Sequence, residues 1–149
     1  MRFLDLVTPL SDAAFTTPVL IPRLRGLEDS SRYWSPGMVI EHLNIVGKGM
    51  QGIIVGLSNG KALDRVVSTA AVKPTGTIGR EALLAEFRAL HIGLRERLIP
   101  QCGPHLDHPK LVHPWFGPLG ARDWMALLAG HMDIHENQLR AILAKASAE

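Results

Sequence analysis

Residues 121–143, ARDWMALLAGHMDIHENQLRAIL, carry the pattern that decides the fold class. Apolar side chains recur there at the three- and four-residue spacing of an amphipathic helix, and His131 and His135 lie on the same stripe as Trp124 and Leu128. Four residues of helix correspond to a rise of about 6 Å and an angular offset of about 40°. Both imidazoles can therefore reach one metal ion.

A third histidine, His42, lies in another helical pattern over residues 35–57. Catalytic zinc-type centres usually take three protein ligands and leave a further position for water or substrate. His42 is therefore a candidate for the third ligand of a metal site beside His131 and His135. The residue pattern alone assigns no catalytic residue.

The rest of the chain predicts an all-α protein. Prolines interrupt the first 33 residues, Ser35 and Pro36 are a good N-cap and first helical residue, and Leu83, Phe87 and Leu94 fall on one side of a third helix. In chain order we expect one irregular helix to about Asp29, a helix over 35–57, a surface connection over 61–79, a helix over 80–99, a connection over 100–120 and a helix from about Ala121.

Three glycines interrupt the apolar second helix at three- and four-residue spacing, namely Gly49, Gly52 and Gly56. Each costs about 0.5 to 1 kcal/mol relative to alanine. Two explanations remain open, close packing of a neighbouring helix or subunit and room for a ligand. Because one chain of this length leaves such a face incompletely covered, we expect a homodimer.

Length and composition indicate one ordinary domain, residues 1–149. The chain has 46% hydrophobic and 20% charged residues, which is typical of a globular protein. Its net charge of +2 is spread along the sequence, so we expect no nucleic-acid partner. Charged residues inside the second helix argue against a membrane span.

The sequence also favours a cytoplasmic location. Cys102 is the only cysteine, so there is no internal disulfide to suggest an oxidising compartment. Asp5 and Pro9 interrupt the N-terminal stretch where a signal peptide needs apolar residues.

Trp34 and Ser35 precede His42, and Gln138 comes three residues after the HxxxH of the last helix. In these features the chain resembles the DinB/YfiT-like superfamily of bacterial metal-binding four-helix bundles. The resemblance covers about residues 34–143. It implies an up-up-down-down bundle in which three imidazoles hold one divalent ion. Nickel or zinc is expected first, with iron or manganese as alternatives.

The resemblance also implies a function. Members are described as metal-dependent hydrolases or as transferases that use low-molecular-weight thiols, and an open coordination position suits both. Arg88 or Arg95 would be candidates to bind the carboxylates of such a thiol. Two alternatives remain, a non-catalytic module that binds a metal or small ligand, and histidines that only pack the core.

Other candidate residues are weaker. His91 either lines the same cavity or is simply packed, and the loop histidines His105, His108 and His113 lack a regular ligand spacing. Cys102 lies beside that loop, where a lone cysteine is usually inert.

Three carboxylates are sequence neighbours of the expected ligands, Glu41, Asp133 and Glu136. Adjacent residues point about 100° apart on a helix. We therefore expect these carboxylates to face solvent or a helix contact and not the metal.

Overall fold

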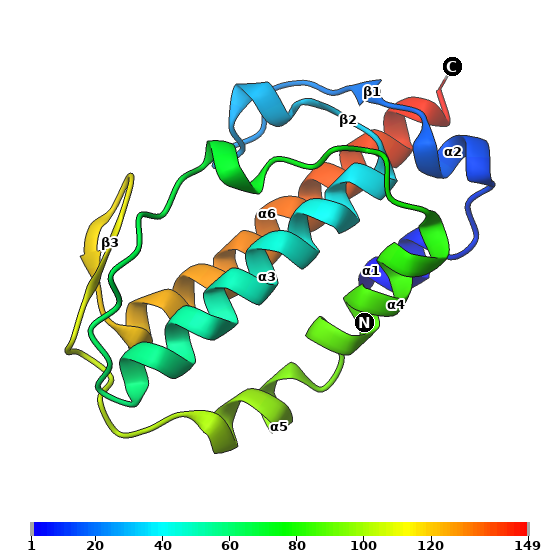
Figure 1. Ribbon diagram of the computed structural model, residues 1–149. Coiled ribbons are helices and arrows are strands. Elements are labelled where there is room, and N and C mark those ends of the chain that lie inside the picture. Colours follow the sequence, from blue (N-terminus) through cyan, green and yellow to red (C-terminus); the bar gives the residue numbers. More distant parts are fainter. Residues whose placement is uncertain (1, 149) are drawn as a thin grey trace.

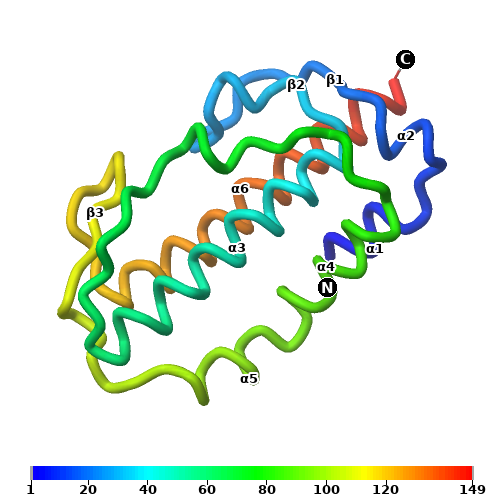
Figure 2. Tube along the Cα trace, in the orientation of Figure 1, coloured from blue at the N-terminus to red at the C-terminus, as the bar shows by residue number. Residues whose placement is uncertain are grey.

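The computed structural model describes residues 2–148, and most of them are helical (Figure 1). Two long helices, α3 (Pro36–Ser58) and α6 (Ala121–Ala146), lie side by side along the length of the molecule (Figures 1 and 2). On its other flank α3 packs against α4 (Arg80–His91). The chain is therefore mostly helical, which is compatible with the predicted all-α fold class.

Both long helices begin where the sequence predicts. The Ser35 hydroxyl accepts a hydrogen bond from the Met38 backbone N–H at 3.1 Å, and Pro36 occupies the first turn of α3. At the start of α6 the Gly120 N–H donates to Asp123 Oδ2 at 3.0 Å. These local contacts satisfy backbone groups that a helix end leaves free.

The prediction of one helix up to Asp29 is wrong. The segment forms the short helices α1 (Arg2–Val7) and α2 (Asp12–Thr16), followed by the strand β1 (Val19–Leu20). β1 pairs antiparallel with β2 (Tyr33–Trp34). Prolines at positions 9, 18 and 22 lack the backbone N–H that a continuous helix needs.

The third predicted helix is broken in two. α4 ends at His91, Ile92 is extended, and Gly93 adopts a left-handed φ of 60° before α5 (Leu94–Leu98) begins. The Arg97 guanidinium donates to the carbonyls of Leu90 and Ile92 at 2.8 and 3.2 Å. It thereby satisfies carbonyl groups that the break releases from the helix.

The two long connections differ. Residues 61–79 contain no α-helix and only the short 3-10 helix η2 (Ala70–Val72), as the surface connection predicts. Residues 100–120 hold a hairpin that the sequence did not predict, β3 (Leu111–His113) paired with β4 (Gly117–Leu119). The remaining 3-10 turns are η1 (Asp29–Ser31) and η3 (Ile99–Gln101).

The core consists of two apolar clusters along α3. One joins α1, α2, α3, α4 and the end of α6, where the rings of Phe3 and Phe87 lie 5.6 Å apart between centroids. The other joins the C-terminal half of α3 to the start of α6 around Trp124. No helix within the described residues is both long and apolar enough to cross a membrane.

Candidate metal centre

The three predicted ligands meet between α3 and α6. His42 comes from the second turn of α3, and His131 and His135 come from the middle of α6. One candidate ligand nitrogen from each lies within 4.8 Å of the other two. The Nε2 atoms of His42 and His131 are 3.1 Å apart. Side chains 89 residues apart in the chain are thus brought together as predicted.

The measured separation of one pair fits a shared metal ion. Nitrogens bound at about 2.0–2.1 Å lie about 2.8 to 3.4 Å apart for angles between 90° and tetrahedral. The His42–His131 pair at 3.1 Å already falls in that range. Imidazole nitrogens are donors for several divalent ions of the first transition row, among them zinc, nickel and iron.

The ring of His42 is oriented by a backbone carbonyl. Its Nδ1 lies 2.7 Å from the Val72 carbonyl oxygen. Because a carbonyl oxygen only accepts, Nδ1 carries the proton and Nε2 keeps its lone pair. Nε2 is the atom that faces His131. Such an outer hydrogen bond is typical of metal-ligating histidines.

Two hydrogen bonds of Gln138, which we call the Gln138 relay, orient the ring of His135. Gln138 is fully buried, and its Nε2 donates to the Ser31 carbonyl at 2.7 Å. This bond places the amide oxygen toward His135, whose Nδ1 donates to it at 2.6 Å. His135 therefore also keeps its lone pair on Nε2. Gln138, which the family resemblance placed beside the ligands, uses its amide oxygen on His135 Nδ1 and its amide nitrogen on the Ser31 carbonyl.

His131 has no comparable support. Its Nδ1 is buried, and no atom of residues 2–148 accepts a hydrogen bond from it. His131 is also less buried than the other two histidines. Of the three candidate ligands, His131 has the least restrained ring.

Burial keeps all three imidazoles neutral at pH 7. Desolvation, with a smaller effect of the positive charges that His135, His42 and His91 would carry, lowers the pKa of His131 to about 2. Desolvation and His42 lower the pKa of His135 to about 3, against a smaller opposing effect of Gln138. Burial also lowers the pKa of His42, opposed by the Val72 hydrogen bond. Neutral imidazoles have the free lone pairs that a cation needs.

Trp34 closes one side of the centre. Its ring lies nearly parallel to that of His135, with centroids 6.1 Å apart, and 5.0 Å from the ring of His42. The side chain is buried. An apolar wall of this kind limits access of water and strengthens electrostatic interactions inside the site.

The carboxylates next to the histidines in sequence do not point at them, as predicted. Their expected place at solvent or at a helix contact is not confirmed for all three. Asp133 is exposed. Glu136 is buried and makes ion pairs with Arg2 and Arg140 at 3.2 and 2.9 Å. Glu41 faces neither solvent nor a helix, because it is 1% exposed and binds the 61–79 connection.

His91 is a packed histidine and does not belong to the grouped ligands. It is 2% exposed, and its Nε2 lies 3.2 Å from the Leu43 carbonyl oxygen. Gly47 makes the room, since a Cβ at that position would meet the His91 ring, with Nε2 at 2.9 Å. Desolvation lowers the pKa of His91 to about 4.

The loop histidines do not join the centre either. His113 accepts from the Trp115 N–H at 3.1 Å and packs 5.5 Å from the Trp124 ring. Within residues 2–148 the one group that could hold a metal comprises His42, His131 and His135. The Cys102 thiol donates to the Leu98 carbonyl at 3.3 Å and has no histidine partner among the described residues.

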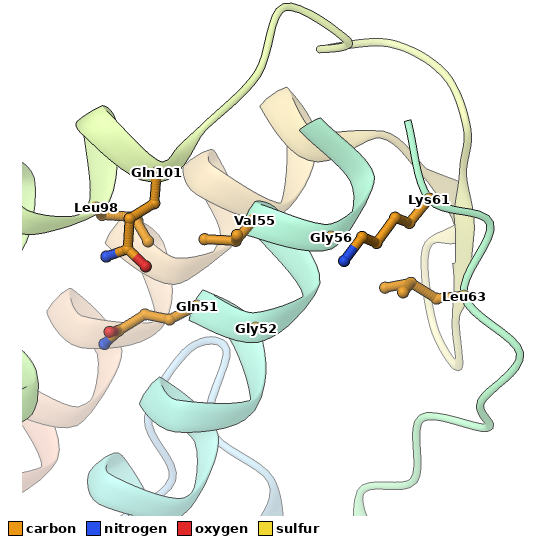
Figure 3. A pocket seen from close by; sticks show the side chains of 8 residues that line it. All are labelled: Gln51, Gly52, Val55, Gly56, Lys61, Leu63, Leu98 and Gln101. Atoms are coloured by element: carbon orange, nitrogen blue, oxygen red, sulfur yellow. The ribbon is translucent and has the colours of Figure 1, made fainter. Parts of the chain in front are cut away.

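The glycines of α3 have separate surroundings. A Cβ at Gly56 would lie 3.0 Å from Leu63 of the 61–79 connection, so that glycine allows a loop and not a helix to approach. A Cβ at Gly49 or Gly52 would meet nothing within 4 Å. Gly52 instead lines a cavity of about 380 Å³ away from the histidines (Figure 3), together with Gln51, Val55, Gly56, Lys61, Leu63, Leu98 and Gln101.

Comparison of the chain with protein-family models, with curated proteins and with solved structures finds no match. The case for the site therefore rests on the geometry of the three histidines. What sequence reasoning missed are the groups that orient them, the backbone carbonyls of Val72 and Ser31, because backbone acceptors leave no mark in a residue pattern.

Proposed function

We propose that the protein is a DinB/YfiT-like metalloprotein that binds one divalent ion through His42, His131 and His135. The observation that carries the proposal is the direction of the lone pairs. Hydrogen bonds to Val72 and Gln138 leave Nε2 unprotonated on two of the three rings, and these rings converge with the third.

We infer an enzymatic role for this ion. Three neutral imidazoles leave the dipositive charge uncompensated, and the bound ion would supply Lewis acidity toward water or a low-molecular-weight thiol. The protein residues hold the rings and exclude water on the Trp34 side. The resemblance supports a hydrolase or a thiol-dependent S-transferase, in an up-up-down-down bundle.

One observation favours the alternative of a non-catalytic module that binds a metal or small ligand. Both buried carboxylates next to the ligands are engaged, Glu41 by the 61–79 connection and Glu136 by two arginines. A general base for hydrolysis is therefore not supplied by either of them. Thiol transfer depends less on such a base, because a metal-bound thiol is deprotonated by the ion itself.

Assays on the metal-loaded protein separate these functions. Turnover of an activated ester supports the hydrolase, and turnover of a thiol with an electrophile supports the transferase. Binding of one zinc or nickel ion per chain without either activity supports the non-catalytic module. Absence of metal binding overturns all three.

We also propose that the protein forms a homodimer in the cytoplasm. Gly49 and Gly52 leave open space on α3 that no atom of residues 2–148 fills. A second subunit is the proposed occupant. Light scattering tests the dimer directly.

A further inference from the structure

The 61–79 connection is hydrogen bonded to one buried carboxylate of α3, that of Glu41. Glu41 Oε1 accepts hydrogen bonds from the Thr75 N–H at 2.8 Å and the Thr75 hydroxyl at 2.7 Å. Its Oε2 accepts from the Gly76 N–H at 2.8 Å. Gly76 has a φ of +73°, which suits glycine and turns the chain so that both N–H groups reach the carboxylate. Hydrogen bonds to an ionised acceptor are among the stronger ones in proteins.

The same connection provides the acceptor for His42. The Val72 carbonyl, 2.7 Å from His42 Nδ1, lies three residues before Thr75. Pro74 stands between them and fixes one backbone angle of the intervening chain. Lys73 adds a bond of 3.2 Å from its ammonium group to the Ser30 hydroxyl. A displacement at Thr75 is thus passed to Val72 through a short, stiff segment.

The hydrogen-bond acceptor of His42 lies in a connecting segment, whereas that of His135 lies on the same helix as His135 itself. The acceptor of His135 is Gln138, three residues further along the same helix. The acceptor of His42 is 30 residues away, in a segment without α-helix. Glu41 and His42 are consecutive on α3 and hold this segment at two points about 100° apart around the helix.

We propose that Glu41 is a positioning residue for the metal ligand His42. Its carboxylate holds the Val72–Gly76 segment so that the Val72 carbonyl keeps the proton of His42 on Nδ1 and the lone pair on Nε2, toward His131 and His135. This inference rests on the proposed metal site and assigns to a buried acidic side chain a role in metal affinity without direct coordination.

The first test uses the metal-free protein, in which imidazole ¹⁵N resonances report the tautomer of each histidine. Glu41→Gln keeps the shape of the side chain but sets an amide NH₂ against one of the two N–H donors. His42 in this variant should change from the Nδ1–H form to a mixture of tautomers. His135, held by Gln138, should not change and serves as the internal control.

The second test measures zinc affinity by competition with a chelator. Loss of an outer hydrogen bond to a ligand typically costs 10- to 100-fold in affinity, so we expect Glu41→Gln to bind zinc about 10-fold more weakly. Glu136→Gln is the matched control. Glu136 is also a buried carboxylate beside a ligand, but its partners are Arg2 and Arg140. It should keep the wild-type zinc affinity.

Should Glu41→Gln fail to fold, Thr75→Val keeps both backbone N–H donors to Glu41 and removes the hydroxyl, which donates to Glu41 and also contacts the Thr77 hydroxyl and N–H. It should weaken zinc binding about 3-fold, as expected for loss of one hydrogen bond to the carboxylate. The inference is overturned if the folded variants keep both the wild-type zinc affinity and the Nδ1–H form of His42. If the wild-type protein binds no zinc, the proposed function fails. The tautomer of His42 in the metal-free variants still decides whether Glu41 positions it.

Discussion

Alanine at two glycines of α3 should change stability in opposite directions. Replacing glycine by alanine inside a helix stabilises by about 0.5 to 1 kcal/mol. At Gly52 the new methyl group meets nothing within 4 Å, so this gain remains. At Gly47 the methyl group would meet the ring of His91, including Nε2 at 2.9 Å.

The cost at Gly47 follows from what surrounds His91. The ring is buried against Phe87, with centroids 4.6 Å apart, and is hydrogen bonded to the Leu43 carbonyl. Overpacking of such a site costs about 1 to 3 kcal/mol, and loss of the hydrogen bond about 1 kcal/mol. After subtracting the helix gain, we expect Gly47→Ala to destabilise by about 2 kcal/mol.

Urea denaturation followed by circular dichroism measures both variants under the same conditions. Wild type, Gly47→Ala and Gly52→Ala should have similar m-values, so that the midpoints report stability. The midpoint should fall for Gly47→Ala and rise for Gly52→Ala. Equal shifts of the same sign would refute the packing of His91 against Gly47.

Three further predictions concern acid stability, the Gln138 relay and the oligomeric state. Burial holds the pKa of His91 at about 4, below an unfolded value of about 6.5. The unfolded state therefore binds more protons between these two pH values, and the free energy of unfolding should fall as the pH drops from about 6.5 to 4. Urea midpoints measured across this range should fall less steeply in a folded His91→Phe variant. Gln138→Leu should weaken zinc binding about 10-fold, measured by chelator competition, because it leaves His135 Nδ1 and the Ser31 carbonyl without partners; unchanged affinity would contradict the relay. Light scattering at micromolar concentration should give twice the chain mass of 16.3 kDa, and a mass of one chain would remove the support for the dimer.

The parts of the fold that were predictable have local causes. The starts of α3 and α6 are fixed by Ser35, Pro36 and Asp123, whose effects act within one helical turn. The pairing of His131 with His135 follows from helical geometry alone. The addition of His42 needed a resemblance as well, because nothing local joins two helices 89 residues apart.

The missed features depend on contacts between distant segments. The leucine stripe of the third helix continues through Gly93, so the pattern does not show that this glycine turns to a positive φ. The sequence alone does not distinguish Gly47 from Gly49 and Gly52. In the structure, only Gly47 lies against the ring of His91. Glu41 was expected at a surface or helix contact because the course of the 61–79 connection has no periodicity from which to predict it.

Metal analysis tests the central claim most directly. The wild-type protein, purified without a polyhistidine tag and incubated with zinc, should retain one ion per chain after desalting. His42→Ala and His131→Ala should each lose the ion while keeping nearly the same helical content, and Cys102→Ser should retain it. Zinc-free wild-type protein, or ion retention unchanged in both histidine variants, would contradict the account.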